Sequence, residues 1–401
     1  MIFAFYFFSA LLVFLGWKSL RGGIAYLKFF QTEIAKPKSD FAPFVSIIAP
    51  CRGLDEGLQS NLAALFRQSF PRYEIVFVVG DERDEAVEII EKVSREAISQ
   101  NKSKLIIAGK TIDSSQKVHN LRQAVKEVSA ESEVFVFVDS DARPDTNWLR
   151  NLIAPLENKN VGAATGYRWF VSKKGNFAPA LRSVWNASIA SALGANEKTN
   201  FCWGGSMAIR RETFEKLDLR QRLKGTVSDD YTFTRVLTEA NLLIRFVPQA
   251  LTATVEDCSF RELLEFTTRQ MKITRVYAPH LWKLSFVGSF LFSIIFWTGF
   301  VLLFFLSNWQ FWLALAFLLT IFALGAGKAY LRLKAVKVVL KDYENELNRS
   351  FLWQTTLWTI TPLLFFYNNF SALLSREILW RGIKYELKSP RETVIITDNE
   401  E

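Results

Sequence analysis

Two aspartates that flank a single serine have the type and spacing to hold a metal ion. Asp139 and Asp141 directly follow the apolar run Val134–Val138. Carboxylates one residue apart on a turn can share one hard divalent cation, and that cation can hold a diphosphate. Aspartate and serine are also common in turns and at helix N-caps. The sequence therefore predicts either a metal–diphosphate site or a plain turn at this position.

A second pair of aspartates, Asp229 and Asp230, opens a stretch of helical periodicity that extends to Leu237. A carboxylate in the first turn stabilises a helix, which accounts for one of the two. An acid pair can also supply a general base. Upstream, Gly204 and Gly205 allow close approach of the backbone to a ligand, although a plain turn would explain them too. These four residues are candidates for a second part of the same site.

A basic cluster precedes the first C-terminal apolar run. Arg269, Lys272 and Arg275 fall on one side of a predicted helix. Such a cluster could neutralise a leaving diphosphate. Basic residues next to an apolar run can also serve only to orient it in a membrane. Both interpretations stay open at this point.

The segment from about residue 40 to residue 282 must position these side chains, and it alternates Val/Ile/Phe-rich runs with amphipathic stretches. This alternation predicts an α/β fold in which a mostly parallel sheet has helices on both sides. Continuously apolar runs predict strands buried on both faces, at Phe44–Ala49, Glu74–Val79, Leu105–Ala108 and Val134–Val138. Helical periodicity is found in Leu58–Gln68, Glu82–Ala97 and Lys117–Val128. Ligands of such sheets bind beyond the carboxyl ends of the strands, where Asp81 and Asp84 follow the second strand.

Composition narrows the class of protein. Half of the 401 residues are hydrophobic, which excludes an intrinsically disordered chain. Three cysteines without paired spacing exclude a disulfide framework and a zinc-finger array, and two histidines leave carboxylates as the acid/base groups. The net charge of +9 would permit nucleic-acid binding. Because the basic residues cluster beside apolar runs, membrane orientation explains them better, and we expect no nucleic-acid partner.

Apolar runs near both ends predict an integral membrane protein. Ile2–Trp17 carries no charge and is followed by basic residues, which predicts an N-terminal anchor with its basic flank in the cytoplasm. Leu284–Gly327 is uncharged and about twice as long as one crossing, so it predicts a hairpin that turns at 307–310. Residues 329–350 predict a basic helix on the membrane surface or, equally, a solvated charged helix.

The last apolar run, Phe351–Ser375, contains Pro362 and the polar pair Asn368 and Asn369. A single crossing would place the basic residues after it outside, against the positive-inside rule. We therefore expect a broken or re-entrant segment whose freed backbone groups are covered by protein. The expected divisions are an anchor at 1–22, a cytoplasmic catalytic domain at 40–282, a transmembrane hairpin at 283–328, the basic helix at 329–350, the embedded segment at 351–375 and a tail at 376–401.

Taken in chain order, these motifs resemble those of family 2-type glycosyltransferases of the GT-A fold. The similarity is greatest to ceramide glucosyltransferases and to bacterial hopanoid or glycolipid glycosyltransferases. It extends from about Phe44 to Tyr385 and implies a Rossmann-like GT-A domain with N-terminal and C-terminal transmembrane helices. The matching segments are the Val-Gly-Asp strand end at 79–81, Gln116–Leu121, Asp139–Asp141, Gly204–Arg210, Asp229–Tyr231, Arg269–Ile273 and Trp380–Tyr385.

The resemblance assigns a role to each matching residue. Asp139 and Asp141 match the family's metal–diphosphate motif, and Asp230 matches its catalytic base. Substrate binding is implied for Asp81 or Asp84 at the nucleotide position, and for Lys117, Asn120, Gly204, Gly205, Asp229, Arg269 and Lys272. Lys272 and Ile273 replace an arginine and a tryptophan of the family, so a bidentate contact and any aromatic stacking are absent there.

The resemblance implies an inverting transfer of a hexose from a UDP-sugar to the hydroxyl of a membrane lipid, with Mg²⁺ or Mn²⁺ as cofactor. We expect the enzyme in a bacterial inner membrane. One alternative is a processive polysaccharide synthase, which the missing tryptophan and the small number of apolar helices disfavour. The other is a catalytically silent, nucleotide-sugar-binding membrane scaffold, which the intact Asp139, Asp141 and Asp230 disfavour. The sugar, the lipid and the choice between the two metals stay open.

Overall fold

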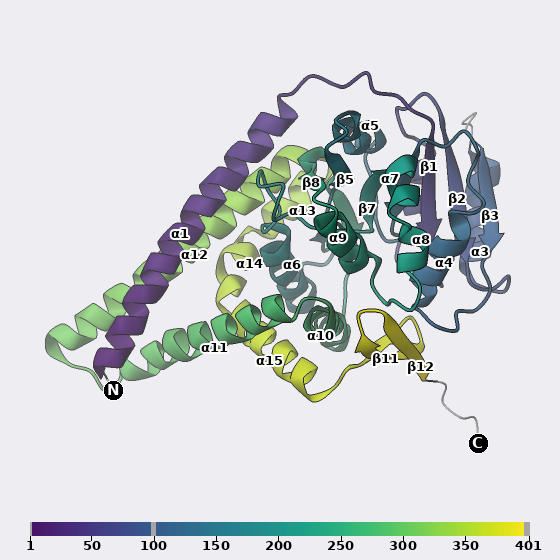
Figure 1. The fold of residues 1–401 in the computed structure, drawn as a ribbon. Coiled ribbons are helices and arrows are strands. Elements are labelled where there is room, and N and C mark those ends of the chain that lie inside the picture. Colours follow the sequence, from purple (N-terminus) through teal and green to yellow (C-terminus); the bar gives the residue numbers. More distant parts are fainter. Residues whose placement is uncertain (1, 98–101, 397–401) are drawn as a thin grey trace. The chain divides into compact units, whose positions relative to one another are not determined.

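A computed structural model describes residues 2–97 and 102–396, and the chain divides into two compact units (Figure 1). The membrane unit comprises residues 1–32, 172–191 and 257–375. The sheet unit comprises residues 33–171, 192–256 and 376–401. Each unit therefore combines segments that are far apart in the sequence.

The sheet unit is built on a seven-stranded sheet of order β3-β2-β1-β4-β7-β5-β8. Its strands are β1 Val45–Pro50, β2 Tyr73–Val79, β3 Ser103–Ile107, β4 Val134–Val138, β5 Val161–Thr165, β7 Ser206–Arg210 and β8 Leu243–Phe246. All neighbours pair in parallel except β7, which is antiparallel to β4 and β5. In the central register Ile47 lies between Ile75 and Val136. The mostly parallel α/β sheet predicted from the sequence is confirmed.

Helices pack on both faces of this sheet, which explains why the strands are continuously apolar. They are α2 Leu58–Leu65, α3 Ala86–Glu96, α4 Gln116–Ala124, α5 Trp148–Ile153, α7 Arg211–Lys216, α8 Leu219–Arg222 and α9 Asp229–Glu239, with 3-10 turns at Ala154–Glu157 and Pro248–Ala250. On β2, Val76 and Val78 join the core formed with α4, α7, α8 and α9. The alternate residue Phe77 points to the other face, where its ring lies 6.0 Å from that of Phe66.

Strand β3 departs from the expectation of burial on both faces. It is the edge strand of the sheet, and Figure 1 shows it outside β2. None of its residues is fully buried, and Ile107 is 47% exposed. An apolar run cannot by itself distinguish a central strand from an edge strand, and here the prediction of full burial is wrong.

The C-terminal residues of the sheet unit form a small antiparallel sheet where the sequence predicted only a tail. Its strands are β10 Glu377–Trp380, β11 Ile383–Ser389 and β12 Glu392–Ile396. Arg381 and Gly382 connect β10 to β11 with φ of 51° and 76°. Two left-handed residues are what a two-residue hairpin turn requires, and this explains the glycine. A separate two-stranded sheet pairs β6 Arg168–Val171 with β9 Thr252–Val255 in parallel.

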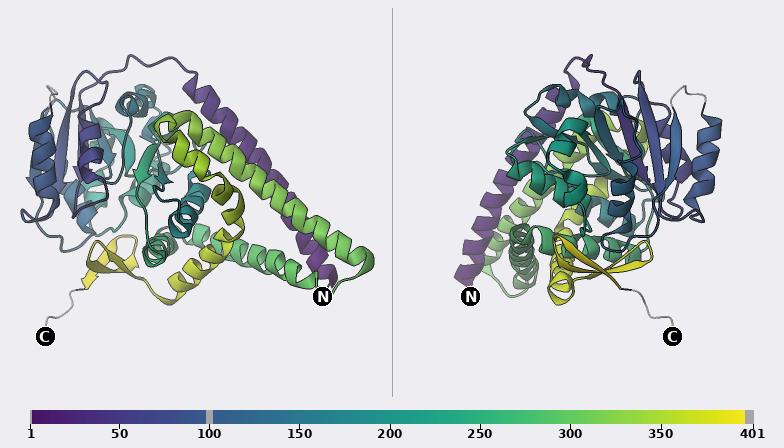
Figure 2. Two further views of the ribbon diagram at one scale, coloured as in Figure 1. Left: turned by 180° about the vertical axis from the view of Figure 1, so that it is seen from behind. Right: turned by 45° about the vertical axis from the view of Figure 1, so that its right-hand side comes forward.

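The membrane unit is helical. Its helices are α1 Ile2–Ile34, α6 Phe177–Ala190, α10 Phe260–Tyr277, α11 Pro279–Leu302, α12 Asn308–Val339, α13 Glu344–Arg349, α14 Phe351–Thr356 and α15 Thr361–Leu374, with 3-10 turns at Lys341–Tyr343 and Leu357–Thr359. Among the described residues, α1, α11 and α12 are long and apolar enough to cross a membrane. Both views of Figure 2 show α1 beside α12, and a Cβ on Gly16 would lie 3.2 Å from the Leu324 side chain. A side chain at this position would crowd Leu324, so the glycine favours the close approach of the two helices.

Two membrane segments have other bounds than the sequence suggested. Helix α1 continues to Ile34 instead of ending near residue 22. Helix α12 continues to Val339, so the first half of the expected surface helix at 329–350 is the end of a long membrane helix. No proline interrupts the chain between residues 327 and 339, and a charged stretch without a breaker can extend a helix beyond the bilayer.

The last apolar run is divided into α14, a 3-10 turn and α15. Pro362 lies in the first turn of α15, where a missing N–H costs nothing. The 14 residues of α15 span about 21 Å, which is too short to cross a bilayer. Its polar pair is used within the unit: Asn368 Oδ1 accepts a hydrogen bond from Thr267 Oγ1 at 3.2 Å, and Asn369 Nδ2 donates to Ser285 Oγ at 3.0 Å. Re-entry of this segment stays a prediction.

Candidate active site

The first part of the candidate site is the Asp139-Ser140-Asp141 turn at the carboxyl end of β4. Its backbone is fixed by a hydrogen bond from Ala142 N to Asp139 O at 3.1 Å. Asn61 Nδ2 donates to Ser140 O at 3.0 Å, and Ser140 Oγ donates to Asp55 Oδ2 at 2.6 Å. These contacts hold the turn in place, so the two aspartate side chains start from a rigid backbone.

Arg168, at the start of β6, bridges the two aspartates. Its Nη1 lies 2.7 Å from Asp141 Oδ2 and its Nη2 lies 3.0 Å from Asp139 Oδ2. The guanidinium also lies over the Trp203 ring at 4.8 Å from its centroid. Asp141 Oδ1 is buried and has no hydrogen-bond partner. The planar fork of arginine matches two carboxylates well, and it leaves one carboxylate oxygen available for another ligand.

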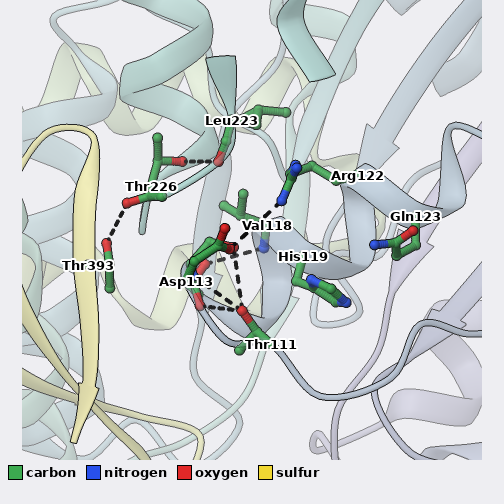
Figure 3. Close-up of polar contacts among 12 residues, drawn as sticks. Thr111, Asp113, Val118, His119, Arg122, Gln123, Leu223, Thr226 and Thr393 are labelled. Carbon is green, nitrogen blue, oxygen red and sulfur yellow. Dashed lines mark hydrogen bonds and ion pairs between the residues drawn. The ribbon is translucent and has the colours of Figure 1, made fainter. Parts of the chain in front are cut away.

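Lys117 connects this turn to the second acid pair. Its Nζ lies 2.8 Å from Asp139 Oδ1 and 3.2 Å from Asp229 Oδ2. The lysine lies in the first turn of α4, whose N-cap Ser115 accepts a hydrogen bond from Val118 N. Figure 3 shows the loop before α4, where Asp113 forms a 3.8 Å ion pair with Arg122 of the same helix. Asp139 and Asp229, which are 90 residues apart in the sequence, are therefore joined through one ammonium group.

Asp229 and Asp230 form the first turn of α9, behind the N-cap Ser228. Asp229 is 2% exposed, whereas Asp230 is half-buried. Gly204 N donates a hydrogen bond to Asp230 Oδ1. Of the two aspartates, Asp230 is therefore the one whose carboxylate is accessible.

The two glycines are required by the side chains beside them. A Cβ on Gly204 would lie 1.8 Å from Asp229 Oδ2. A Cβ on Gly205 would lie 2.1 Å from the Trp203 ring and 2.6 Å from Asp139 Oδ2. These distances are far inside van der Waals contact, so neither position accepts a larger residue without movement. The sequence suggested that these glycines let the backbone approach a ligand. In the structure the backbone at these glycines lies close to Trp203 and to the carboxylates of Asp139 and Asp229, and a contact with a ligand stays a prediction.

Charge and burial give these carboxyl groups different pKa values. Burial, reinforced by the negative charge of Asp229, raises the pKa of Asp230 to about 7. Burial also raises the pKa of Asp141 to about 6, although Arg168 opposes this effect. For Asp139, burial is outweighed by the positive charges of Lys117 and Arg168, and its pKa lies below the usual value. Burial raises the pKa of Asp229 as well, so Asp139 is the aspartate of the cluster whose ionised form is stabilised, and the other three have raised pKa values.

Three other predicted site residues lie in the sheet unit. Asp84 Oδ1 accepts hydrogen bonds from Gly53 N at 2.8 Å and Ala86 N at 3.0 Å, so it ties the loop after β1 to the start of α3. Asp81 Oδ1 accepts a local hydrogen bond from Arg83 N at 3.0 Å. Asn120 is buried, where its Oδ1 accepts from Gln116 Nε2 at 2.8 Å and its Nδ2 donates to Val78 O at 3.5 Å. The contacts of Asn120 hold α4 against β2.

The remaining two predicted residues, Arg269 and Lys272, belong to α10 of the membrane unit. The Arg269 guanidinium lies over the Phe266 ring at 5.5 Å from its centroid. Ile273, which takes the place of the family's tryptophan, is buried. Binding of a diphosphate by Arg269 and Lys272 stays a prediction.

The family model described as Glycosyl transferase family 21 matches residues 16–393 of the chain. The chain belongs to this family. Its identification as a glycosyltransferase that resembles ceramide glucosyltransferases is therefore confirmed.

Two similar proteins of this type are known from Caenorhabditis elegans. Ceramide glucosyltransferase 3 is 22% identical over 264 residues, which cover 64% of this chain and 56% of the relative. Ceramide glucosyltransferase 1 is 23% identical over 200 residues, which cover 49% of this chain and 42% of the relative. The chain thus spans about half the length of these relatives.

Two solved structures resemble the glycosyltransferase at low similarity. One is the mannosyltransferase PcManGT from Pyrobaculum calidifontis in complex with GDP-Man and Mn²⁺, with a TM-score of 0.46, 19% identity and coverage of 92% of this chain and 98% of that one. The other is GalNAc-T7 with UDP, GalNAc and Mn²⁺, with a TM-score of 0.38, 14% identity and coverage of 55% and 45%.

Sequence reasoning missed two arginines of the candidate site. Arg168 bridges Asp139 and Asp141, and the signal for it was a lone charge inside the apolar run 161–171. Arg381, in the turn between β10 and β11, forms an ion pair with Asp55. It lies in the Trp380–Tyr385 motif, which the sequence comparison noted without assigning it a role.

The same C-terminal motif contacts the glycosyltransferase sheet through Tyr385. Its hydroxyl accepts a hydrogen bond from Gln116 N at 3.1 Å, directly before Lys117. The small C-terminal sheet therefore supports both the Asp139–Asp141 turn, through Asp55, and the start of α4.

Proposed function

We propose that this family 21 member is a membrane-bound, inverting glycosyltransferase that moves a hexose from a UDP-sugar to the hydroxyl of a membrane lipid. The observation that carries the proposal is the convergence of two acidic motifs on Lys117. Lys117 touches Asp139 of the first motif and Asp229 of the second, next to the half-buried Asp230. A site for a charged donor thereby lies beside a carboxylate that can accept a proton.

The donor end fits a divalent cation, Mg²⁺ or Mn²⁺, held by Asp139 and Asp141. Among the described residues no three acidic, histidine or cysteine side chains gather at ligand distance, so the protein offers two carboxylates at most. That is the usual protein share for Mg²⁺ in sites where substrate phosphates and water complete the coordination. The buried, unpartnered Asp141 Oδ1 favours such a ligand. When bound, the metal would offset negative charge on the diphosphate.

Two basic side chains of the protein could also contact the phosphates of the donor. Lys117 and Arg168 carry the positive charge nearest to the two metal-binding carboxylates. Both can hold donor phosphates in place once these carboxylates have another partner. Asp81 or Asp84 would bind the nucleotide, and Arg269 and Lys272 would bind the leaving diphosphate, as the resemblance implies.

At the acceptor end, Asp230 would act as the general base. The acceptor oxygen attacks the anomeric carbon and forms the new glycosidic bond, while the bond from that carbon to the UDP oxygen breaks. The acceptor proton passes to the Asp230 carboxylate. A base whose pKa is raised to about 7 suits proton transfer at neutral pH. One such displacement inverts the configuration at the sugar, so no second nucleophile is needed.

A lipid acceptor is supported by two observations. The similar nematode proteins are named ceramide glucosyltransferases. In the described part of the chain, three helices are long and apolar enough to cross a membrane, which would tether the catalytic residues near lipid. The basic residues that follow α1's apolar part favour a cytoplasmic catalytic domain, and we propose a bacterial inner membrane as the host membrane.

The test is release of UDP from a panel of UDP-sugars by the detergent-purified full chain, with and without Mn²⁺ or Mg²⁺. Mixed lipids that contain ceramide, diacylglycerol and hopanoid serve as acceptors. We expect release with one sugar that depends on both lipid and metal, and a labelled lipid product. Binding of a donor without release under any condition would instead support a silent scaffold, and growth of the product into a polymer would support a synthase.

A further inference from the structure

The membrane unit contains a cavity of about 420 Å³ between α1, α11, α12 and the segment from Trp358 to Phe365. Most of its lining is apolar, including Leu12, Phe292 and Ile321. Its volume falls within the range of small-molecule sites in proteins. A Cβ on Gly288 would meet no other atom within 4 Å, so this part of the wall faces open space.

Two cations line one end of this otherwise apolar cavity. Lys328 and Arg332 lie one helical turn apart on α12. Arg332 is only 5% exposed, and its Nε is buried without a hydrogen-bond partner. Neither the lining of this cavity nor that of the adjoining space of about 120 Å³ includes an aspartate or glutamate. Within the described part of the chain, neither cation forms an ion pair.

A buried guanidinium without a counter-charge is costly, because burial removes water and nothing replaces it. The hydroxyl of Tyr26, which lines the adjoining space together with Arg332, is also buried without a hydrogen-bond partner. These groups would all be satisfied by one anion with several acceptor oxygens. A phosphate has this chemistry.

The position of the cations along α12 indicates where that anion comes from. Residues 308–327 of α12 are uncharged and span about 30 Å, the thickness of the hydrocarbon core of a bilayer. Lys328 follows directly and thus lies at the level of lipid headgroups. From there the apolar lining extends along α12 to Ile321 and along α1 to Leu12, which is the direction of the hydrocarbon. The cavity thus offers a cationic end at the headgroup and an apolar body below it.

We propose that this cavity binds a phospholipid with an anionic headgroup, whose phosphate contacts Arg332 and Lys328 and one of whose chains fills the apolar part. This site goes beyond the proposed transfer reaction, since none of its residues takes part in that reaction. The bound lipid completes the membrane unit and is not consumed.

The test measures lipid retention by native mass spectrometry of the full chain in a neutral detergent, supplied with phosphatidylglycerol or phosphatidylcholine. The wild type should retain phosphatidylglycerol at least about tenfold more strongly than phosphatidylcholine. The double variant Lys328→Gln/Arg332→Gln should lose this preference. Lys334→Gln removes a charge from an exposed position on the same helix and should keep it.

A second variant tests the apolar part without touching the charges. Gly288→Leu places a side chain in the open space and should reduce retention of both lipids, whereas Val287→Leu, at an exposed neighbour that does not line the cavity, should not. If the charge variant fails to fold, Gly288→Leu still tests whether the lipid occupies the cavity. Equal retention by the charge variant and by Lys334→Gln, or unchanged retention in Gly288→Leu, would overturn the proposal. So would displacement of the lipid by an equal concentration of inorganic phosphate, because the site would then bind the free anion.

Discussion

The assignment of Asp230 as general base leads to a quantitative pH dependence. A carboxylate accepts a proton only when it is ionised, and burial raises the pKa of Asp230 to about 7. At about pH 6 roughly one-tenth of the enzyme would hold the ionised base, and at about pH 8 roughly nine-tenths. The kcat/KM for UDP release should therefore rise about tenfold between these values and be lost as the pH falls through 7.

The substitution Asp230→Asn tests the same role. Asparagine keeps an oxygen that can accept the hydrogen bond from Gly204 N, so the start of α9 should keep its structure. Turnover should fall by about 10²–10⁴-fold because the base is gone, while donor affinity stays close to that of the wild type. The residual activity should lose the rise around pH 7.

The assay is steady-state UDP release with lipid acceptor across the pH range, together with donor binding by calorimetry. Asp218→Asn is a matched control, since it makes the same chemical change at an exposed position with φ of 48°, where asparagine is well tolerated. Turnover of Asp230→Asn above about a tenth of the wild-type value would refute the assignment of the base. A flat wild-type pH profile would refute the raised pKa.

Three further predictions concern the construction of the site. Gly204→Ala should lower the free energy of unfolding by about 1–3 kcal/mol and abolish most activity, because its Cβ would lie 1.8 Å from Asp229 Oδ2. The control is Gly194→Ala, whose Cβ would have no atom within 4 Å. This variant should behave like the wild type in thermal unfolding and in turnover. Arg168→Met should destabilise the metal-free protein by about 1–3 kcal/mol in denaturant unfolding, since it leaves two half-buried carboxylates without their shared partner. A loss no larger than that of Arg222→Met, whose ion pair is exposed, would contradict this. Burial raises the pKa of the Cys51 and Cys202 thiols, so a maleimide should react first with the half-buried Cys258. Mass spectrometry identifies the labelled residue. Early labelling of Cys51 or Cys202 would contradict their burial.

Much of the fold could be predicted because it depends on local patterns. The continuous apolar run at Val134–Val138 corresponds to a strand with the same bounds, and the stretch that opens at Asp229 forms α9. The uncharged run Leu284–Gly327 contains two apolar helices with a turn between them. In each case the local pattern of hydrophobic residues is enough to predict the element, without knowledge of its tertiary contacts.

The parts that could not be predicted depend on partners distant in the sequence. Whether the run at 103–107 is central or at an edge depends on the strand order, which no single segment contains. The small C-terminal sheet owes its position to contacts such as that of Tyr385 with Gln116 N, across 269 residues. The sequence of residues 377–396 alone gave no reason to expect that they contact the candidate site.

The sequence by itself predicted which carboxylates would carry the chemistry, because Asp139, Asp141 and Asp230 stand in motifs whose order resembles that of a family. It also determined that the chain enters a membrane, since length and hydropathy suffice for that conclusion. Only the tertiary structure decided that Lys117 joins the two acidic motifs, that Arg168 bridges Asp139 and Asp141, and that Arg332 is buried without a counter-charge. The physical reason is that the interaction of charges depends on their distance and on the water removed around them, and both are properties of the folded chain.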